Sequence, residues 1–174
     1  LMRRITTQTV QLYLVNQKLE RIRATLYRQT MFATFELMIH TYAEKGKPLT
    51  PQLLKEEYSK LNARYFGEEV VIDDEIAIEW ARIPHFYYNF YVYQYSTGIS
   101  AAQTLVKGVI AGDTTSKDKY LKFLESGGSR YPLETLKKAG VDMTTPQPVK
   151  TTLDEFVTLT AKMEELHNAT QSLV

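Results

Sequence analysis

The chain has 174 residues, with 21 Lys and Arg against 20 Asp and Glu, three His and no Cys. This length suits one domain or part of a larger one, and the balanced charge gives no basic field for nucleic acid. The absence of Cys excludes disulfides, Cys-ligated zinc, iron–sulfur clusters and Cys nucleophiles.

The first predicted element is a long helix over roughly residues 3–44. Its apolar residues recur mainly at steps of three, four and seven, as on one helix face, and they are Ile5, Leu12, Val15, Leu19, Ile22, Leu26, Met31, Phe35, Met38, Ile39 and Tyr42. No turn signal occurs before Gly46 and Pro48. A helix of that length, about 60 Å, is typical of a large helical body.

A second helix is predicted over residues 51–65. Thr50 can accept a capping hydrogen bond, and Pro51 suits the first helical position because no N–H is needed there. The buried face of this helix is expected to consist of Leu54, Tyr58, Leu61 and Tyr65. Asp73 and Asp74 then look like the cap of a third, short helix.

Four further helices are predicted after a break at Pro84. They cover residues 86–111, 116–126, 132–140 and 152–169. Ser116 is the expected cap of the second of these, and a Thr-x-x-Glu capping box introduces the last one after a stiff linker at residues 145–148. The chain is therefore predicted to be all-α.

Residues 83–98 are rich in tyrosine, since five of the 12 tyrosines fall between positions 87 and 95. On a helix, Tyr88, Tyr91 and Tyr95 would share one face, with His85 just before it. A core stripe is the ordinary interpretation, but each buried tyrosine hydroxyl needs a partner that phenylalanine would not need. A row of phenol and imidazole donors can instead hold peptide carbonyls or stabilise an oxyanion.

Two longer motifs, residues 27–36 (YRQTMFATFE) and residues 78–98 (IEWARIPHFYYNFYVYQYSTG), resemble the C-terminal part of oligoendopeptidase F, a zinc metallopeptidase family related to thimet oligopeptidase. Residues 123–129 and 140–143 also resemble that family's ending, so the resemblance covers nearly the whole chain. It implies a large, mostly helical zincin fold with a deep substrate channel.

The resemblance also implies an activity, the hydrolysis of internal bonds in short peptides by a zinc-bound water with a glutamate as general base. By their places in the motif, Tyr95 and His85 are implied to stabilise the oxyanion or contact the substrate, and Tyr88 to bind the substrate. No role is implied for Tyr91. Short peptides are the implied substrates, and Zn²⁺ is the implied cofactor.

The sequence departs from the family at the metal site. The family holds zinc through HExxH on one helix and a glutamate on the next, whereas this chain has no HExxH, and its histidines, His40, His85 and His167, lie far apart. No metal ligand is therefore assigned. Residues 1–174 are expected to be the C-terminal segment of a metallopeptidase catalytic domain, with the HExxH-bearing part upstream in the same enzyme, and to be inactive alone.

Structural roles are the simpler interpretation of the remaining polar residues. Arg28 needs a buried carboxylate or carbonyl groups if it faces inward, and Glu36 is expected to pair along its helix or at the edge of the core. His40 suits a helix end or the surface, and His167 should be solvated. The acidic residues 73–75 fit helix capping better than calcium binding, because no EF-hand spacing follows.

Two other function classes are weighed against a peptidase. One is a stand-alone helical module whose tyrosine face binds peptides without catalysis. Nucleic-acid binding by stacking is disfavoured, because Arg82 and Lys107 only flank the aromatic segment. No run of about 18 apolar residues predicts a membrane span, residues 1–7 do not predict a signal peptide, and the protein is expected to be cytoplasmic.

Overall fold

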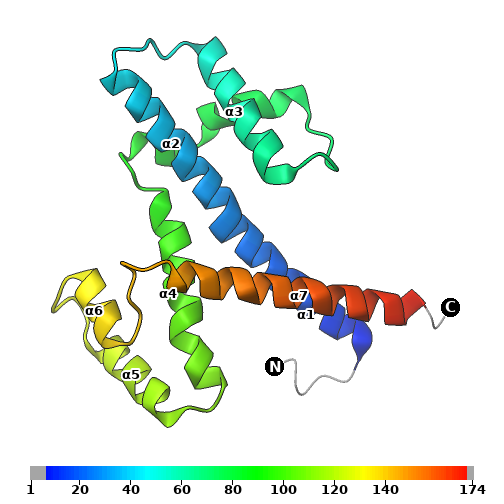
Figure 1. Cartoon of the computed structure of the whole chain (residues 1–174), viewed down its shortest axis with the longest axis vertical. Coiled ribbons are helices and arrows are strands. Elements are labelled where there is room, and N and C mark those ends of the chain that lie inside the picture. The colour runs from blue at the N-terminus through cyan, green and yellow to red at the C-terminus, as the bar shows by residue number, and fades with distance from the viewer. Residues whose placement is uncertain (1–6, 172–174) are drawn as a thin grey trace. The chain divides into compact units, whose positions relative to one another are not determined.

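The computed structural model describes residues 7–171, and this part of the chain is helical with no strand (Figure 1). Its α-helices are α1 (Gln8–Ile22), α2 (Arg28–Glu44), α3 (Pro51–Phe66), α4 (Tyr93–Ile110), α5 (Thr114–Glu125), α6 (Pro132–Lys138) and α7 (Gln147–Gln171), and its 3₁₀ segments are η3 (Asp74–Arg82) and η4 (Pro84–Tyr87). The predicted all-α class is confirmed. Among the described residues, no helix is long and apolar enough to cross a membrane.

The long helix predicted over residues 3–44 contains one irregular turn, the π-helical segment Arg23–Tyr27 between α1 and α2. The apolar residues step by three or four on either side of it, but by five from Leu26 to Met31. A π turn bonds residues five apart, so the extra residue is accommodated and both side chains stay buried. Residues 3–6 of the predicted helix lie outside the described residues.

Residues 25–96 form one compact unit, in which α3 packs against both α2 and η3. Its core consists of the buried side chains Met31, Phe32, Phe35, Tyr58, Leu61, Ile83 and Val92. Tyr58 and Leu61 lie on the predicted inner face of α3, and Leu54 and Tyr65 extend that face as partly buried residues. The predicted buried face is therefore confirmed.

The other unit joins the described residues up to Ala24 with those from Thr97 onward. In it, α1 packs on α7, and an ion pair between Lys18 and Glu155 links the two helices. A separate core lies among the elements from α4 to the start of α7, and its buried residues are Ala101, Leu105 and Val141.

Two helices of this second unit approach closely at Gly108 of α4. A Cβ atom at that position would lie 2.6 Å from Ser116 Cβ and 2.2 Å from its Oγ. The prediction that Ser116 caps α5 is wrong. Asp113 caps the helix and accepts hydrogen bonds from the Ser116 N–H and hydroxyl. The capping contact fixes Ser116, so a side chain at Gly108 would have to displace it.

The final helix also begins earlier than predicted, at Gln147. Pro148 then lies in the first turn, where a missing N–H costs no hydrogen bond. The predicted stiff linker and capping box are therefore wrong: Thr152 lies inside α7, is buried, and donates to Pro148 O at 3.3 Å. The predicted start of α3 is confirmed, because the Thr50 hydroxyl accepts a hydrogen bond from Leu53 N at 3.2 Å.

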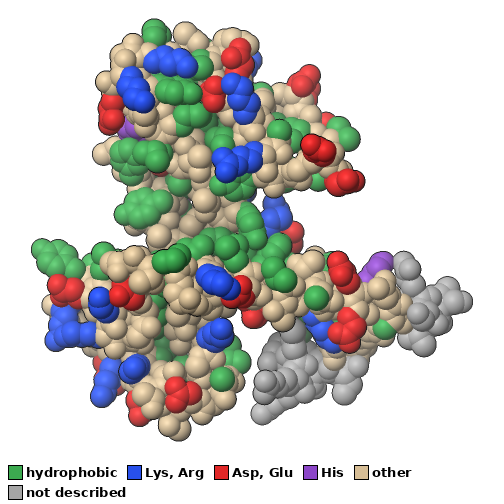
Figure 2. Space-filling model, viewed as in Figure 1, with side chains coloured by type: hydrophobic (Ala, Val, Ile, Leu, Met, Phe, Trp, Pro, Cys, Tyr) green, Lys and Arg blue, Asp and Glu red, His purple; other side chains and the backbone are tan. Residues whose placement is uncertain are grey.

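The surface carries exposed hydrophobic side chains as well as charges. On the face shown in Figure 2, acidic and basic groups are interspersed, and hydrophobic side chains lie among them. Large hydrophobic residues that are exposed in the described chain include Leu37, Val71 and Val157. These three lie on α2, between α3 and η3, and on α7, and single exposed hydrophobic residues of this kind are ordinary on a protein surface.

Candidate functional site

Residues 88–92 are not helical, although a helix over residues 86–111 is predicted. α4 begins only at Tyr93. Before it, Asn89 and Phe90 have φ angles of 47° and 61°, in the left-handed region that a right-handed helix excludes. The chain therefore turns between η4 and α4, and we call this turn the reversal.

The reversal is held by two side chains of α2. The buried Glu36 accepts a hydrogen bond from Phe90 N on Oε1 at 2.7 Å. One turn later, His40 packs its ring against the Phe90 ring, with centroids 4.3 Å apart. A left-handed non-glycine residue costs about 1–2 kcal/mol, and these contacts offset part of that cost. Glu36 thus binds the backbone of the turn rather than a partner on its own helix.

The reversal brings His85 and three tyrosines together, although these tyrosines do not share a helix face as predicted. The rings of His85 and Tyr91 are parallel, with an interplanar angle of 3° and centroids 5.5 Å apart. Tyr95 meets both rings edge-on at 5.5 Å, and Tyr88 meets Tyr91 edge-on at 6.1 Å. We refer to these four residues as the aromatic cluster. It contains every site residue assigned from the sequence, together with Tyr91.

Hydrogen bonds of the Tyr95 hydroxyl connect the aromatic cluster. This hydroxyl donates to the Tyr91 hydroxyl at 3.5 Å and lies 3.2 Å from His85 Nε2. His85 Nε2 donates to this hydroxyl or accepts from it according to which ring nitrogen carries the proton. The Tyr91 hydroxyl raises the pKa of Tyr95 above its ordinary value, and desolvation adds to this effect. Tyr95 is therefore protonated at neutral pH.

The first turn of α4, which carries Tyr95, is bonded to the start of α2. Ser96 Oγ donates to Leu26 O at 3.2 Å and lies 3.0 Å from Thr30 Oγ1. The Thr30 hydroxyl also donates to Leu26 O, at 2.7 Å. These contacts place Tyr95 on a fixed element rather than on the turn.

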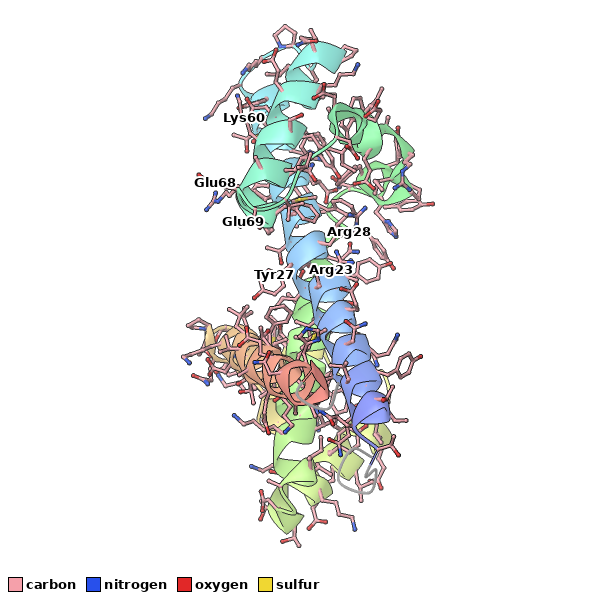
Figure 3. The ribbon with its side chains drawn as sticks, turned by 90° about the vertical axis from the view of Figure 1, so that its right-hand side faces the viewer. Arg23, Tyr27, Arg28, Lys60, Glu68 and Glu69 are labelled. Carbon is pink, nitrogen blue, oxygen red and sulfur yellow. The ribbon has the colours of Figure 1, made fainter. Side chains whose placement is uncertain are left out.

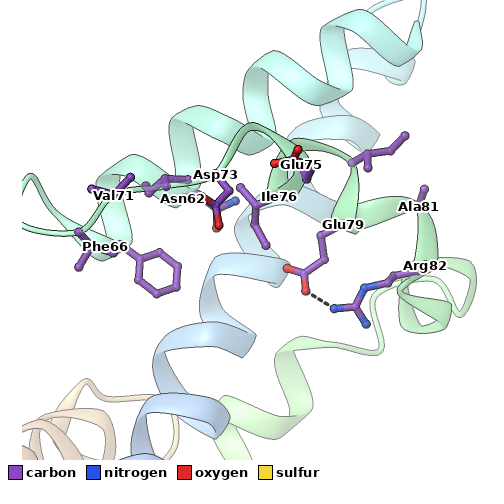
Figure 4. A pocket seen from close by; sticks show the side chains of 12 residues that line it. Asn62, Phe66, Val71, Asp73, Glu75, Ile76, Glu79, Ala81 and Arg82 are labelled. Carbon is purple, nitrogen blue, oxygen red and sulfur yellow. Dashed lines mark hydrogen bonds and ion pairs between the residues drawn. The ribbon is translucent and has the colours of Figure 1, made fainter.

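A buried ion network lies in the same unit. Glu79 is 6% exposed and receives hydrogen bonds from Arg28 and Arg82 on Oε1, both at 2.5 Å, and from the Tyr58 hydroxyl on Oε2 at 2.7 Å. Figure 3 marks Arg28 on α2, and Figure 4 shows the contact of Glu79 with Arg82. An inward-facing Arg28 was expected to need a buried carboxylate or carbonyl groups, and its partner is the Glu79 carboxylate. Burial and the hydrogen bond to Glu79 raise the pKa of Tyr58 far above its usual range.

The described residues do not fit the zinc that the sequence resemblance implies. Among residues 7–171, no group of three His, Cys, Asp or Glu side chains is arranged as metal ligands. His85 contacts Tyr95, His40 packs on Phe90, and His167 is exposed on α7. The chemistry of the aromatic cluster is therefore that of hydrogen-bond donors and aromatic faces.

Two residues at this site are missed by sequence reasoning alone. Tyr91 has no assigned role, although its place in the tyrosine run is a signal. Glu36 follows the buried Phe35 directly, and a buried carboxylate is rare unless it has a partner. That partner, Phe90 N, cannot be found from the sequence, because no glycine marks the left-handed turn.

Comparisons with known proteins agree with the motifs. The sequence profile of Peptidase family M3 matches residues 4–155. Oligopeptidase PepF of Bacillus subtilis (strain 168) is 51% identical over 166 residues, which are 95% of this chain and 25% of that protein. The plasmid oligoendopeptidase F of Lactococcus lactis subsp. cremoris is 43% identical over 153 residues, covering 88% of this chain and 26% of that protein.

A solved structure gives the same result. The crystal structure of oligoendopeptidase-F from Enterococcus faecium matches with a TM-score of 0.93 at 44% identity, covering 96% of this chain and 32% of that one. The chain spans about a quarter of the length of the curated relatives that it matches. The aromatic cluster and the ion network both lie within the range matched by the family profile. The chain belongs to peptidase family M3.

Proposed function

We propose that this chain forms the substrate-binding wall of an M3 metallo-oligopeptidase that hydrolyses internal bonds of short peptides. The supporting observation is the contact between the Tyr95 hydroxyl and His85 Nε2, at 3.2 Å. Around it the cluster is open to solvent, since Tyr88 is 63% exposed and Tyr91 is 38% exposed. Protonated donors at an accessible surface are what recognition of a peptide carbonyl requires.

In this proposal, Tyr95 and His85 donate hydrogen bonds to the substrate carbonyl oxygen as it becomes an oxyanion. Tyr95 turns its proton from the Tyr91 hydroxyl to the substrate oxygen, and it keeps that proton because its pKa lies above neutral pH. The surrounding rings hold Tyr95 in place before the substrate arrives, so little reorganisation is needed. Tyr88 contacts the peptide.

We further infer that the metal site of the parent enzyme is formed by residues other than these 174, because the described residues offer no ligand set. The chain is then the C-terminal segment of the catalytic domain and is inactive alone. Its partners are short peptides and the HExxH-bearing part of the same enzyme.

The test uses a full-length hybrid, in which this chain replaces the 166 matched residues of the Bacillus subtilis oligopeptidase PepF. In the hybrid, Tyr95→Phe is expected to lower kcat on a fluorogenic short peptide by about 10²–10³-fold, the effect of removing one oxyanion donor, and to change KM little. Tyr13→Phe, at an exposed tyrosine of α1, is the matched control and should leave kcat unchanged. An unchanged kcat in Tyr95→Phe would remove Tyr95 from the mechanism.

The second candidate is a peptide-binding module that does not catalyse hydrolysis. It is favoured by one observation: the aromatic cluster is complete within the compact unit of residues 25–96. Isothermal titration of the isolated chain with short peptides tests it. Binding that Tyr95→Phe weakens would support the module, and a chain that binds no peptide would reject it.

A further inference from the structure

The buried ion network around Glu79 has no part in the proposed reaction. Its carboxylate joins three elements, since Arg28 comes from α2 and Tyr58 from α3, whereas Glu79 itself lies on η3. A buried ion pair is weak evidence for stability, because apolar residues of similar volume often stabilise a fold as well or better. Directed hydrogen bonds instead favour one arrangement of the elements that they join. The network is therefore better suited to fixing the place of η3 than to adding stability.

The segment that Glu79 holds leads directly to His85. Ile83 is both the C-cap of η3 and the N-cap of η4, and its N–H donates to Trp80 O while its carbonyl accepts from Phe86 N. His85 is the second residue of η4. Because 3₁₀ segments have poor hydrogen-bond geometry of their own, their place depends on contacts with other elements. The position of His85 thus follows from the contacts that η3 and η4 make.

Arg28, the partner of Glu79 on α2, also reaches the residue beside His85. The Arg28 guanidinium lies over the Phe32 ring, 4.9 Å from its centroid. The Phe32 ring in turn meets the Phe86 ring edge-on, with centroids 5.6 Å apart. Phe86 directly follows His85 in the chain. One aromatic ring therefore separates the ion pair from the neighbour of His85.

Tyr58, the partner on α3, makes a second connection of the same kind. Its ring meets the Phe35 ring edge-on at 5.1 Å, and the Phe35 ring lies 5.4 Å from the Phe86 ring. Arg82 differs from both partners, because its hydrogen bond to Glu79 joins two residues of η3, and 72% of its side chain is exposed (Figure 4). Only Arg28 and Tyr58 therefore link the Glu79 carboxylate to other elements.

We propose that Glu79 is a positioning residue, which places His85 by tying η3 to Arg28 and Tyr58. The proposal rests on the proposed function, because it takes His85 as a group that contacts the substrate. A misplacement of about 1 Å can lower a rate about 10²-fold. Breaking the tie between η3 and α2 should therefore slow catalysis in a chain that remains folded.

Paired substitutions in the full-length hybrid test the proposal. Arg28→Met and Arg82→Met each remove one guanidinium from Glu79 Oε1, but only the first breaks the tie between η3 and α2. Arg28→Met is expected to lower kcat on the fluorogenic peptide by about tenfold or more and to change KM by less than about threefold. Arg82→Met is the matched control and should leave kcat and KM unchanged.

A double variant separates positioning from stability. Glu79→Met alone leaves the partly buried Arg28 without its carboxylate, so it should lower the Tm of the hybrid. Adding Arg28→Met removes that unpaired charge, and the Tm should recover. The kcat of the double variant should stay low, because the directed hydrogen bonds between η3 and α2 are still missing.

A second readout does not depend on hydrolysis. The His85 ring lies parallel to the Tyr91 ring and edge-on to the Tyr95 ring, both at 5.5 Å, so ring currents shift its Hε1 resonance. In ¹H–¹³C spectra of the 174-residue chain, Arg28→Met should move this resonance toward its random-coil position. Arg82→Met should leave the resonance in place.

Three results would overturn the proposal. They are a His85 resonance that Arg28→Met leaves in place, a kcat that recovers together with the Tm in the double variant, and equal losses of kcat in Arg28→Met and Arg82→Met. The first two would leave the network a purely structural role, and the third would make the charge around Glu79, and not its tie to α2, the important property. A hybrid that cleaves no peptide, with a His85 resonance that moves in Arg28→Met but not in Arg82→Met, would refute the proposed function alone.

Discussion

Replacing Glu36 tests how the aromatic cluster is held in place. Glu36 is 1% exposed, and its carboxylate accepts the Phe90 N–H at 2.7 Å. A hydrogen bond to a charged group contributes about 1.5–3 kcal/mol. Glu36→Ala is therefore expected to lower the free energy of unfolding by about 2–3 kcal/mol. Glu36→Gln should cost less than about 1.5 kcal/mol, because its amide oxygen still accepts the bond.

Two measurements check this expectation. Urea denaturation can be followed by the fluorescence of Trp80, the single tryptophan, which packs against the core of the same unit. Hydrogen exchange of the Phe90 amide should accelerate in Glu36→Ala but not in Glu36→Gln. As a control, Asn89→Gly should raise stability by up to about 1 kcal/mol, because glycine adopts a positive φ without strain.

Two outcomes would refute the reasoning. If Glu36→Gln destabilises the chain as much as Glu36→Ala, then the charge of Glu36, and not its acceptor, is what matters. If Phe90 exchanges at the same rate in the wild-type chain and in Glu36→Ala, the hydrogen bond does not hold the reversal.

Two further changes test packing and protonation. Gly108→Ala is expected to lower the free energy of unfolding by about 1–3 kcal/mol through overpacking. Gly98→Ala, in the same helix but with open space around it, should raise the free energy of unfolding by up to about 1 kcal/mol. Thermal melts of the two variants, run side by side, measure both effects. Hydrogen bonds from Thr144 and Lys137 lower the pKa of Asp142 from 3.8 to about 2. The Asp142 carboxylate therefore stabilises the fold fully at a pH above 3.8, its ordinary pKa, and this stabilisation is lost as the pH falls toward about 2, its pKa in the folded chain. Asp142→Asn should then flatten the acid side of a plot of Tm against pH.

Both changes can fail in a clear way. Equal effects of the two alanine substitutions would mean that α4 and α5 do not meet closely at Gly108. An acid-side profile that is the same with and without Asp142→Asn would mean that the Asp142 carboxylate has no preferred partners in the folded chain.

Much of the helical architecture could be predicted because its signals are local. Thr50 and the proline after it mark the start of α3, and the spacing of Tyr58 and Leu61 identifies its buried face. The start of α7 was harder to predict, because Pro148 serves equally well in a linker and in the first turn of a helix.

The site could be predicted only in part, because its geometry depends on contacts between distant residues. The motif indicated His85, Tyr88 and Tyr95 as candidate site residues, and a turn, not a common helix face, brings them together. That turn depends on the bond between Glu36 and Phe90, which are 54 residues apart, and the left-handed backbone it requires has no sequence signal.

The π turn at Arg23–Tyr27 also bears on which changes in chain length this helix can tolerate. The step of five from Leu26 to Met31 includes one residue more than a regular α-helical turn accommodates. Losing one residue there would shorten the step to four and leave both side chains on the buried face. A deletion between Met31 and Phe35 would rotate the following residues by about 100° and move Phe35 away from the core. We therefore expect relatives of altered length to differ at this turn, with a regular α-helix where the extra residue is missing.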